Sequence, residues 1–92
     1  MQAIKQRFYR AKRRIAGILE QSGYTVMFLE NRIFHVEAIR DKEVRKIRVV
    51  LDKIREKDIE EVRDYELPLI YTKEIWLKIS GEKKFHVKSI KP

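Results

Sequence analysis

Residues 33–51 read IFHVEAIRDKEVRKIRVVL, and this stretch contains two strand patterns separated by a charged turn. Along Ile33–Ile39 apolar side chains fall on alternate positions, and residues 40–43 have the composition of a turn. Val44–Leu51 begins with alternation and ends in an apolar run, which is typical of a strand that enters a covered interior. We therefore expect two consecutive strands of one sheet.

A helix is predicted before this stretch, roughly over Gln2–Gln21. An apolar stripe recurs there at helical spacing, formed by Ile4, Phe8, Ala11, Ile15 and Ile18 with Leu19 beside them. The pair Ser22-Gly23 predicts the helix end, since glycine adopts a positive φ without strain. The segment Tyr24–Leu29 is aromatic, β-branched and too short for a helix, so it is predicted to be a strand.

After residue 51 we expect a second helix, capped by Asp52 and running to about Tyr65. Strands are predicted over Glu74–Ile79 and Phe85–Ile90, with a hairpin turn between them. The predicted order is α-β-β-β-α-β-β, and the helices must bury their apolar sides on the sheet. The expected fold is a small single-domain α/β (α+β) sandwich, with helices packed on a mixed sheet.

The composition limits the class of protein. Ninety-two residues support one ordinary core, and 22 basic against 14 acidic residues give a net charge of +8, which favours a polyanionic partner. Cysteine is absent, so disulfides and thiolate zinc sites are excluded. No apolar stretch is long enough for a membrane span or a signal peptide, and we expect a cytoplasmic protein.

Many Lys, Glu and Ile residues beside few amides suggest a thermophilic source, a hypothesis that an ordinary melting temperature would contradict.

The positive charge is unevenly distributed. Residues 1–23 carry a net charge of +5, residues 24–51 carry +2, residues 52–66 carry −3 and residues 67–92 carry +4. The first helix holds the densest group of basic residues, which are Lys5, Arg7, Arg10, Lys12, Arg13 and Arg14. Tyr9 lies among them. Such a strip suits phosphate binding, because each neutralised phosphate releases a counterion. The alternatives are a solvated helix face and a membrane-surface helix, and the second is disfavoured because the sheet needs the apolar side.

The C-terminal hairpin supplies a second group of basic residues, Lys78, Lys83, Lys84, Lys88 and Lys91. We interpret these lysines as guards of an edge strand rather than as a second binding surface. Trp76 is predicted to belong to the core.

Motifs for chemistry are few. There is no glycine-rich phosphate loop and no paired metal-ligand spacing, and His35 and His86 stand alone on separate predicted strands. Glu37 is the one acid inside a clearly predicted core strand, which makes it a weak candidate for a catalytic metal ligand. One such acid is too few for a divalent-metal site, so we expect no metal and no cofactor.

Four segments together resemble the core of the PD-(D/E)xK nuclease superfamily, which includes the archaeal Holliday-junction resolvases. They are residues 18–26 (ILEQSGYTV), 34–40 (FHVEAIR), 46–50 (KIRVV) and 73–77 (KEIWL). The resemblance implies a restriction-endonuclease-like fold, a nucleic-acid context and a homodimer. In the best register, His35 stands where the family has its strand-two Asp, and Arg48-Val49-Val50 stands at the Glu-x-Lys motif. The family's acid in the first helix has no counterpart before Glu20.

The leading hypothesis is a nucleic-acid-binding protein with a nuclease-like fold and no catalytic activity, with DNA a better partner than RNA. Its phosphate contacts would come from the basic residues of the first helix, together with Arg48, whose guanidinium attracts a phosphate backbone. One alternative is a divergent Mg²⁺-dependent endonuclease or junction resolvase that uses Glu37. Another is a protein-interaction or dimerisation module built on a sheet edge and the acidic second helix.

Overall fold

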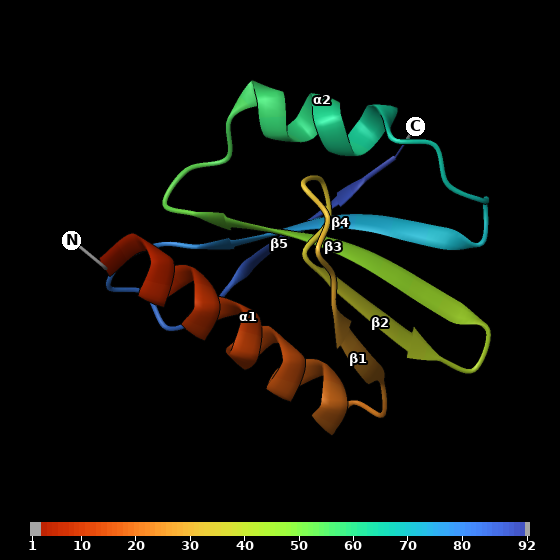
Figure 1. Ribbon diagram of the computed structural model, residues 1–92, viewed down its shortest axis with the longest axis horizontal. Coiled ribbons are helices and arrows are strands. Elements are labelled where there is room, and N and C mark those ends of the chain that lie inside the picture. Colours follow the sequence, from red (N-terminus) through yellow and green to blue (C-terminus); the bar gives the residue numbers. More distant parts are fainter. Residues whose placement is uncertain (1–2, 92) are drawn as a thin grey trace.

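The computed structural model describes residues 3–91, which form two helices and one five-stranded sheet (Figure 1). The elements are α1 (Ala3–Gln21), β1 (Thr25–Phe28), β2 (Val36–Arg40), β3 (Glu43–Leu51), α2 (Glu56–Asp64), β4 (Tyr71–Lys78) and β5 (His86–Ile90). In the sheet the strands lie in the order β1-β2-β3-β4-β5. The β3–β4 pair is parallel and the other pairs are antiparallel. The predicted element order and the mixed sheet are therefore confirmed, while the predicted helix start at Gln2 lies outside the described residues.

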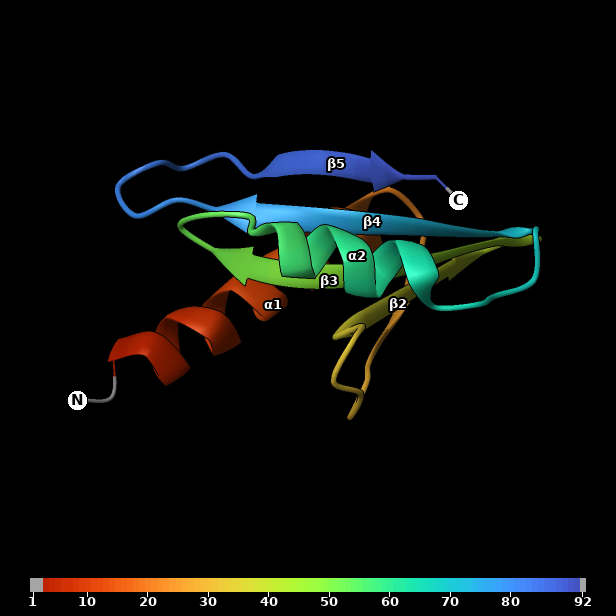
Figure 2. The same cartoon turned by 90° about the horizontal axis from the view of Figure 1, so that it is seen from above.

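The two helices cover opposite faces of the sheet (Figures 1 and 2). A parallel pair needs a crossover connection, and α2 lies in the crossover between β3 and β4. Helix α2 contacts β4 and β5, whereas α1 contacts β1, β2 and β3. The arrangement is the expected sandwich. Within the described residues, no helix is both long and apolar enough to cross a membrane.

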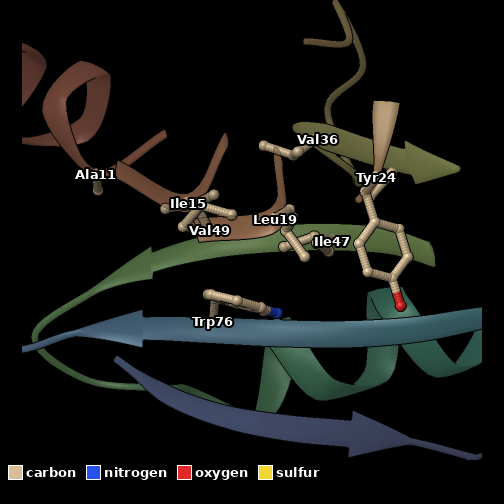
Figure 3. Packing of buried hydrophobic residues seen from close by; sticks show 9 residues of the cluster. Ala11, Ile15, Leu19, Tyr24, Val36, Ile47, Val49 and Trp76 are labelled. Carbon is tan, nitrogen blue, oxygen red and sulfur yellow. The ribbon is translucent and has the colours of Figure 1, made fainter. Parts of the chain in front are cut away.

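Beneath α1 lies the larger of two apolar clusters (Figure 3). Ala11 and Ile15 of the predicted apolar stripe point into it, together with the neighbouring Leu19. Ile4 and Ile18 of the same stripe are exposed, because they lie at the start of the helix and at the border of its buried side. The residues that meet them come from the sheet and its borders: Tyr24, Val36, Ala38, Ile47, Val49 and Trp76. Trp76 is 5% exposed, so its predicted place in the core is confirmed.

The cluster beneath α2 is smaller and contains Phe34, Val50, Val62, Ile75 and Ile90. Because successive strand residues point to opposite faces, the adjacent Ile75 and Trp76 serve different clusters. The strand β4 thereby connects both halves of the core.

Two strand boundaries differ from the prediction. Strand β2 begins at Val36 instead of Ile33, because the Asn31 side chain accepts hydrogen bonds from the backbone N–H groups of Ile33 (2.7 Å) and Phe34 (3.2 Å). Such an Asx turn diverts the backbone from the strand ladder. Strand β4 begins at Tyr71 instead of Glu74, since residues 71–78 pair in register with the whole of residues 44–51.

The prediction that Asp52 caps the second helix is wrong. Helix α2 begins at Glu56, and the carboxylate that supports its start is Asp58, which accepts a 2.9 Å hydrogen bond from the Arg55 N–H. Asp52 itself adopts a positive φ of 70° at the end of β3. Its carboxylate binds Arg7 and the Ser80 N–H instead.

Candidate nucleic-acid interface

The basic strip predicted from the sequence lies on the side of α1 that faces away from the sheet. Ala11, Ile15 and Leu19 fix this orientation, because they are buried beneath the helix. Of the six basic side chains, four are exposed, namely those of Lys5, Arg10, Arg13 and Arg14. Arg7 and Lys12 lie at the borders of the strip and are half-buried.

Arg7 differs from the others because its charge is neutralised. Its guanidinium donates two hydrogen bonds to the Asp52 carboxylate, at 2.9 and 2.8 Å. The pKa of Arg7 is raised chiefly by this hydrogen bond. The same bond, followed by the one from the Ser80 backbone, lowers the pKa of Asp52 to about 2. Arg7 therefore connects α1 to the end of β3 and adds little to the field of the strip.

Arg13 and Arg14 are held in place by neutral acceptors, which orient a guanidinium without cancelling its charge. Arg13 donates to the Tyr9 hydroxyl at 3.3 Å, and its guanidinium lies 5.7 Å from the centre of the Tyr9 ring. Arg14 donates to the Lys83 carbonyl at 2.8 Å and stacks 5.3 Å from the Phe85 ring. Both cations are thus positioned by contacts that leave them attractive to an anion.

Lys12 lies over two aromatic rings, with its Nζ 5.2 Å from the centre of Phe8 and 5.5 Å from that of Phe28. In the described part of the chain, no ion pair includes Lys12 or any of the four exposed cations of the strip. We name these five residues the α1 cation face: Lys5, Arg10, Lys12, Arg13 and Arg14.

The hairpin loop between β4 and β5 adjoins the α1 cation face through the bond from Arg14 to Lys83, at the same end of the molecule as the start of α1 (Figure 1). Lys83 and Lys84 are exposed in this loop and extend the basic surface beyond the helix. Sequence reasoning missed this juxtaposition, because no local pattern links residues 69 positions apart. Lys88, in contrast, lies on β5 at the edge of the sheet. This is the position expected for a lysine that protects an edge strand from pairing with another chain.

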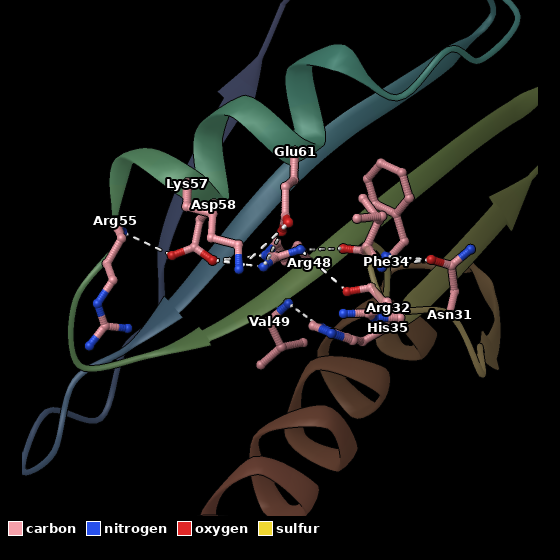
Figure 4. Close-up of polar contacts among 11 residues, drawn as sticks. Asn31, Arg32, Phe34, His35, Arg48, Val49, Arg55, Lys57, Asp58 and Glu61 are labelled. Atoms are coloured by element: carbon pink, nitrogen blue, oxygen red, sulfur yellow. Dashed lines mark hydrogen bonds and ion pairs between the residues drawn. The ribbon is translucent and has the colours of Figure 1, made fainter.

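The Arg48 side chain extends from β3 to α2 and takes part in a network of polar contacts (Figure 4). Its guanidinium is 2.9 Å from carboxylate oxygens of both Asp58 and Glu61. It also donates to the backbone carbonyls of Ile33 (3.2 Å) and Arg32 (3.4 Å). The Arg48 side chain is 13% exposed. Its donors and its charge are therefore satisfied within the protein, and we leave Arg48 out of the candidate surface. Asp58 and Glu61 lie one helical turn apart on the predicted second helix, and this spacing was the sequence signal that could have indicated a shared basic partner.

His35 lies beside Arg48 and is an integral part of the packing. Its Nδ1 accepts a 2.9 Å hydrogen bond from the Val49 N–H, and Phe8 meets its ring edge-on at 4.8 Å. Burial, followed by the charges of Arg48 and Lys12, lowers the pKa of His35 to about 4. The imidazole is therefore neutral at pH 7.

The residues that the sequence resemblance aligns with the metal ligands of the nuclease superfamily do not fit Mg²⁺, which binds oxygen ligands. Those positions hold His35, Arg48 and Val50, and a guanidinium repels a dication. Glu37, the weak catalytic candidate, forms a 2.5 Å ion pair with Lys46, and Glu20 is exposed near the end of α1. Over residues 3–91 there is no group of three His, Asp or Glu side chains arranged to hold an ion.

Comparisons with protein-family models, with curated proteins and with solved structures found no match to this chain.

Proposed function

We propose that this chain is a cytoplasmic nucleic-acid-binding protein that contacts the phosphate backbone of DNA through the α1 cation face and the adjoining hairpin loop, and that it does not cleave its ligand. The observation that carries the proposal is the α1 cation face itself, where five cations have no acidic partner among the described residues. A phosphate backbone supplies the missing counter-charges at regular intervals.

A comparison of which arginines form ion pairs supports the same proposal. Five of the ten arginines form ion pairs with acids, namely Arg7, Arg40, Arg45, Arg48 and Arg63. Among the remaining five, three lie within five consecutive residues of α1, and they are Arg10, Arg13 and Arg14. A solvated helix face in a charge-rich protein would carry acids interspersed among its bases, whereas no acid precedes Glu20.

Binding without cleavage rests on the Arg48 network. Metal-dependent cleavage needs oxygen ligands that converge on a cation, whereas Asp58 and Glu61 converge on the Arg48 guanidinium, at the position that the resemblance aligns with a metal ligand. Incubating the protein with supercoiled plasmid, linear duplex and a four-way junction in Mg²⁺ or Mn²⁺ tests this part. Cleavage that disappears in Glu37→Gln would overturn it and favour the endonuclease alternative.

The salt dependence of binding measures how many phosphates are engaged. We expect log affinity for a labelled duplex, measured by fluorescence anisotropy, to fall with log salt with a slope of roughly −4 to −5, as about five phosphate contacts require. A protein that binds neither duplex, junction nor single strand at low salt would refute the proposal.

Charge reversal locates the surface. The triple variant Arg10→Glu/Arg13→Glu/Arg14→Glu should abolish binding, because it replaces three phosphate-attracting cations by anions. The matched control is Lys42→Glu/Lys57→Glu/Lys88→Glu, which reverses three exposed cations outside the α1 cation face. Both triple variants lower the net charge from +8 by six units. Equal loss of binding in the two variants would mean that net charge, and not this face, is responsible.

A further inference from the structure

We propose that Tyr9 is a stacking platform for an unpaired nucleobase, so that the α1 cation face binds single-stranded nucleic acid more tightly than duplex. This inference rests on the proposed function and specifies its ligand.

The position of Tyr9 has no structural explanation in the core. It is 53% exposed, which makes it the most exposed Phe, Tyr or Trp of residues 3–91, and it belongs to neither apolar cluster. Tyrosine is also a weaker helix former than the Lys, Arg and Gln residues around it. The ring therefore offers an exposed aromatic face in the middle of a cationic helix face.

The surroundings of Tyr9 combine the two kinds of group that bind a nucleotide, a cation for its phosphate and an aromatic ring for its base. An open hollow beside the ring is lined by Gln6, Tyr9, Arg10, Arg13 and Arg14. The bond from Arg13 to the Tyr9 hydroxyl keeps a guanidinium beside the ring. A nucleotide joins a phosphate to a flat base, so a cation placed next to an aromatic face contacts both parts of it.

The same side of the molecule carries a second exposed aromatic residue. Phe28, at the end of β1, is 45% exposed, and Lys12 lies 5.5 Å from its centre. Aromatic rings alternating with cations are typical of surfaces that follow a single strand, because every base has a π-face and every nucleotide a phosphate. In a duplex the base faces are stacked on one another, so the rings of Tyr9 and Phe28 would have no free base face to stack on.

The test compares three ligands of equal phosphate number with the wild-type protein and with Tyr9→Leu: a single-stranded oligonucleotide, a single strand with abasic sites, and a duplex. Leucine keeps an apolar side chain of good helix propensity and removes the ring. We expect Tyr9→Leu to weaken single-strand binding by roughly 5- to 100-fold, the range measured for loss of one stacked base, and to leave duplex binding within about twofold. The wild-type protein should lose a similar factor on the abasic strand.

Two further variants serve as controls. Tyr9→Phe keeps the ring and loses only the hydroxyl contact with Arg13, so it should retain the preference for single strands. Tyr65→Leu removes a tyrosine that is 38% exposed at the end of the acidic α2, so it should leave binding to all three ligands unchanged. Circular dichroism and thermal melts establish that each variant is folded.

The outcomes separate the inference from the proposed function. If the wild-type protein binds but Tyr9→Leu weakens single strand and duplex equally, or if the abasic strand binds as well as the intact one, the stacking site is overturned and phosphate binding stands. If the wild-type protein binds none of the ligands at low salt, the proposed function itself fails.

Discussion

Arg7 on α1 and Asp52 at the end of β3 form a bidentate ion pair, with two nitrogen–oxygen distances of 2.9 and 2.8 Å, across 45 residues of sequence. The same carboxylate accepts a 3.0 Å hydrogen bond from the Ser80 N–H in the β4–β5 loop. One acid therefore joins a helix, a strand end and a loop. The contacts assign Arg7 to the fold and distinguish it from its basic neighbours.

Comparing two single variants tests this distinction. Arg7→Gln should lower the melting temperature and should reduce affinity for nucleic acid less than Arg10→Gln does, because Arg7 is already neutralised by Asp52. Arg10→Gln should leave the melting temperature nearly unchanged, since the Arg10 side chain makes no hydrogen bond or ion pair with the residues that the structure describes. Thermal melts and anisotropy titrations on the same samples provide both measurements. A larger binding loss in Arg7→Gln would contradict the assignment.

Asp52 should make stability depend on pH in acid. Its pKa of about 2 in the folded protein lies below the ordinary value of 3.8, so the pair stabilises the fold above pH 3.8 and loses its effect as the pH falls through 2. The difference in urea midpoint between wild type and Asp52→Asn should accordingly be constant from pH 7 to about pH 5 and shrink towards pH 2. A difference that persists unchanged at pH 2 would show that the ionised carboxylate is not responsible.

Arg48 should be important for stability. Arg48→Leu leaves Asp58 without its cation and leaves Glu61 with only its 4.0 Å contact to the exposed Lys57, in a region where the side chains of Arg48 and Asp58 are 13% exposed. We expect the free energy of unfolding to fall by about 3 kcal/mol, as for removal of one partner from a buried ion pair. Adding Asp58→Asn and Glu61→Gln should restore about 1 kcal/mol or more, because the two uncompensated charges are removed. Urea unfolding curves give these values, and a triple variant less stable than Arg48→Leu would argue against the explanation.

His35 should contribute a second pH dependence. Burial lowers its pKa to about 4 in the folded protein, below the ordinary 6.5, so the unfolded chain takes up the proton first. The free energy of unfolding should then decrease as the pH falls from 6.5 to 4, and less so in His35→Gln. An NMR titration of the His35 ring gives its pKa directly. A midpoint near 6.5 would contradict the buried, hydrogen-bonded environment.

Gly17 offers a stabilising substitution. It lies inside α1, and a Cβ at this position would meet nothing within 4 Å. Gly17→Ala should raise the free energy of unfolding by about 0.5–1 kcal/mol, because glycine is costly in a helix interior. Gly23→Ala is the matched control and should destabilise, since Gly23 has a φ of +92°. Differential scanning calorimetry of the two variants measures both effects.

Much of the fold could be predicted from the sequence, because the relevant patterns are local. The helical spacing of Ala11, Ile15 and Leu19 and the apolar end of β3 both depend on periodicity alone. The start of β2 and the role of Asp52 could not be predicted in this way. An Asx turn at Asn31 overrides the strand pattern, and the partners of Asp52 come from α1 and the β4–β5 loop.

The candidate site shows the same limit. In the sequence Arg7, Arg10 and Arg48 carry the same charge, but their roles depend on which acid the fold brings to each of them. Arg10 remains without an acidic partner among the described residues, whereas Arg7 and Arg48 have partners 45 and 10 residues away. Periodicity places a side chain on a face, and only tertiary structure determines what lies opposite it.

The parallel pairing of β3 with β4 has a consequence for how the chain folds. Ile75 and Trp76 lie on β4 and each belongs to one of the two apolar clusters. A chain that ends before β4 has the meander and both helices, but it lacks Trp76 of the larger cluster and both Ile75 and Ile90 of the smaller one. We therefore expect a fragment comprising residues 1–70 to lack a cooperative unfolding transition, and productive folding to begin only once β4 is available to pair with β3.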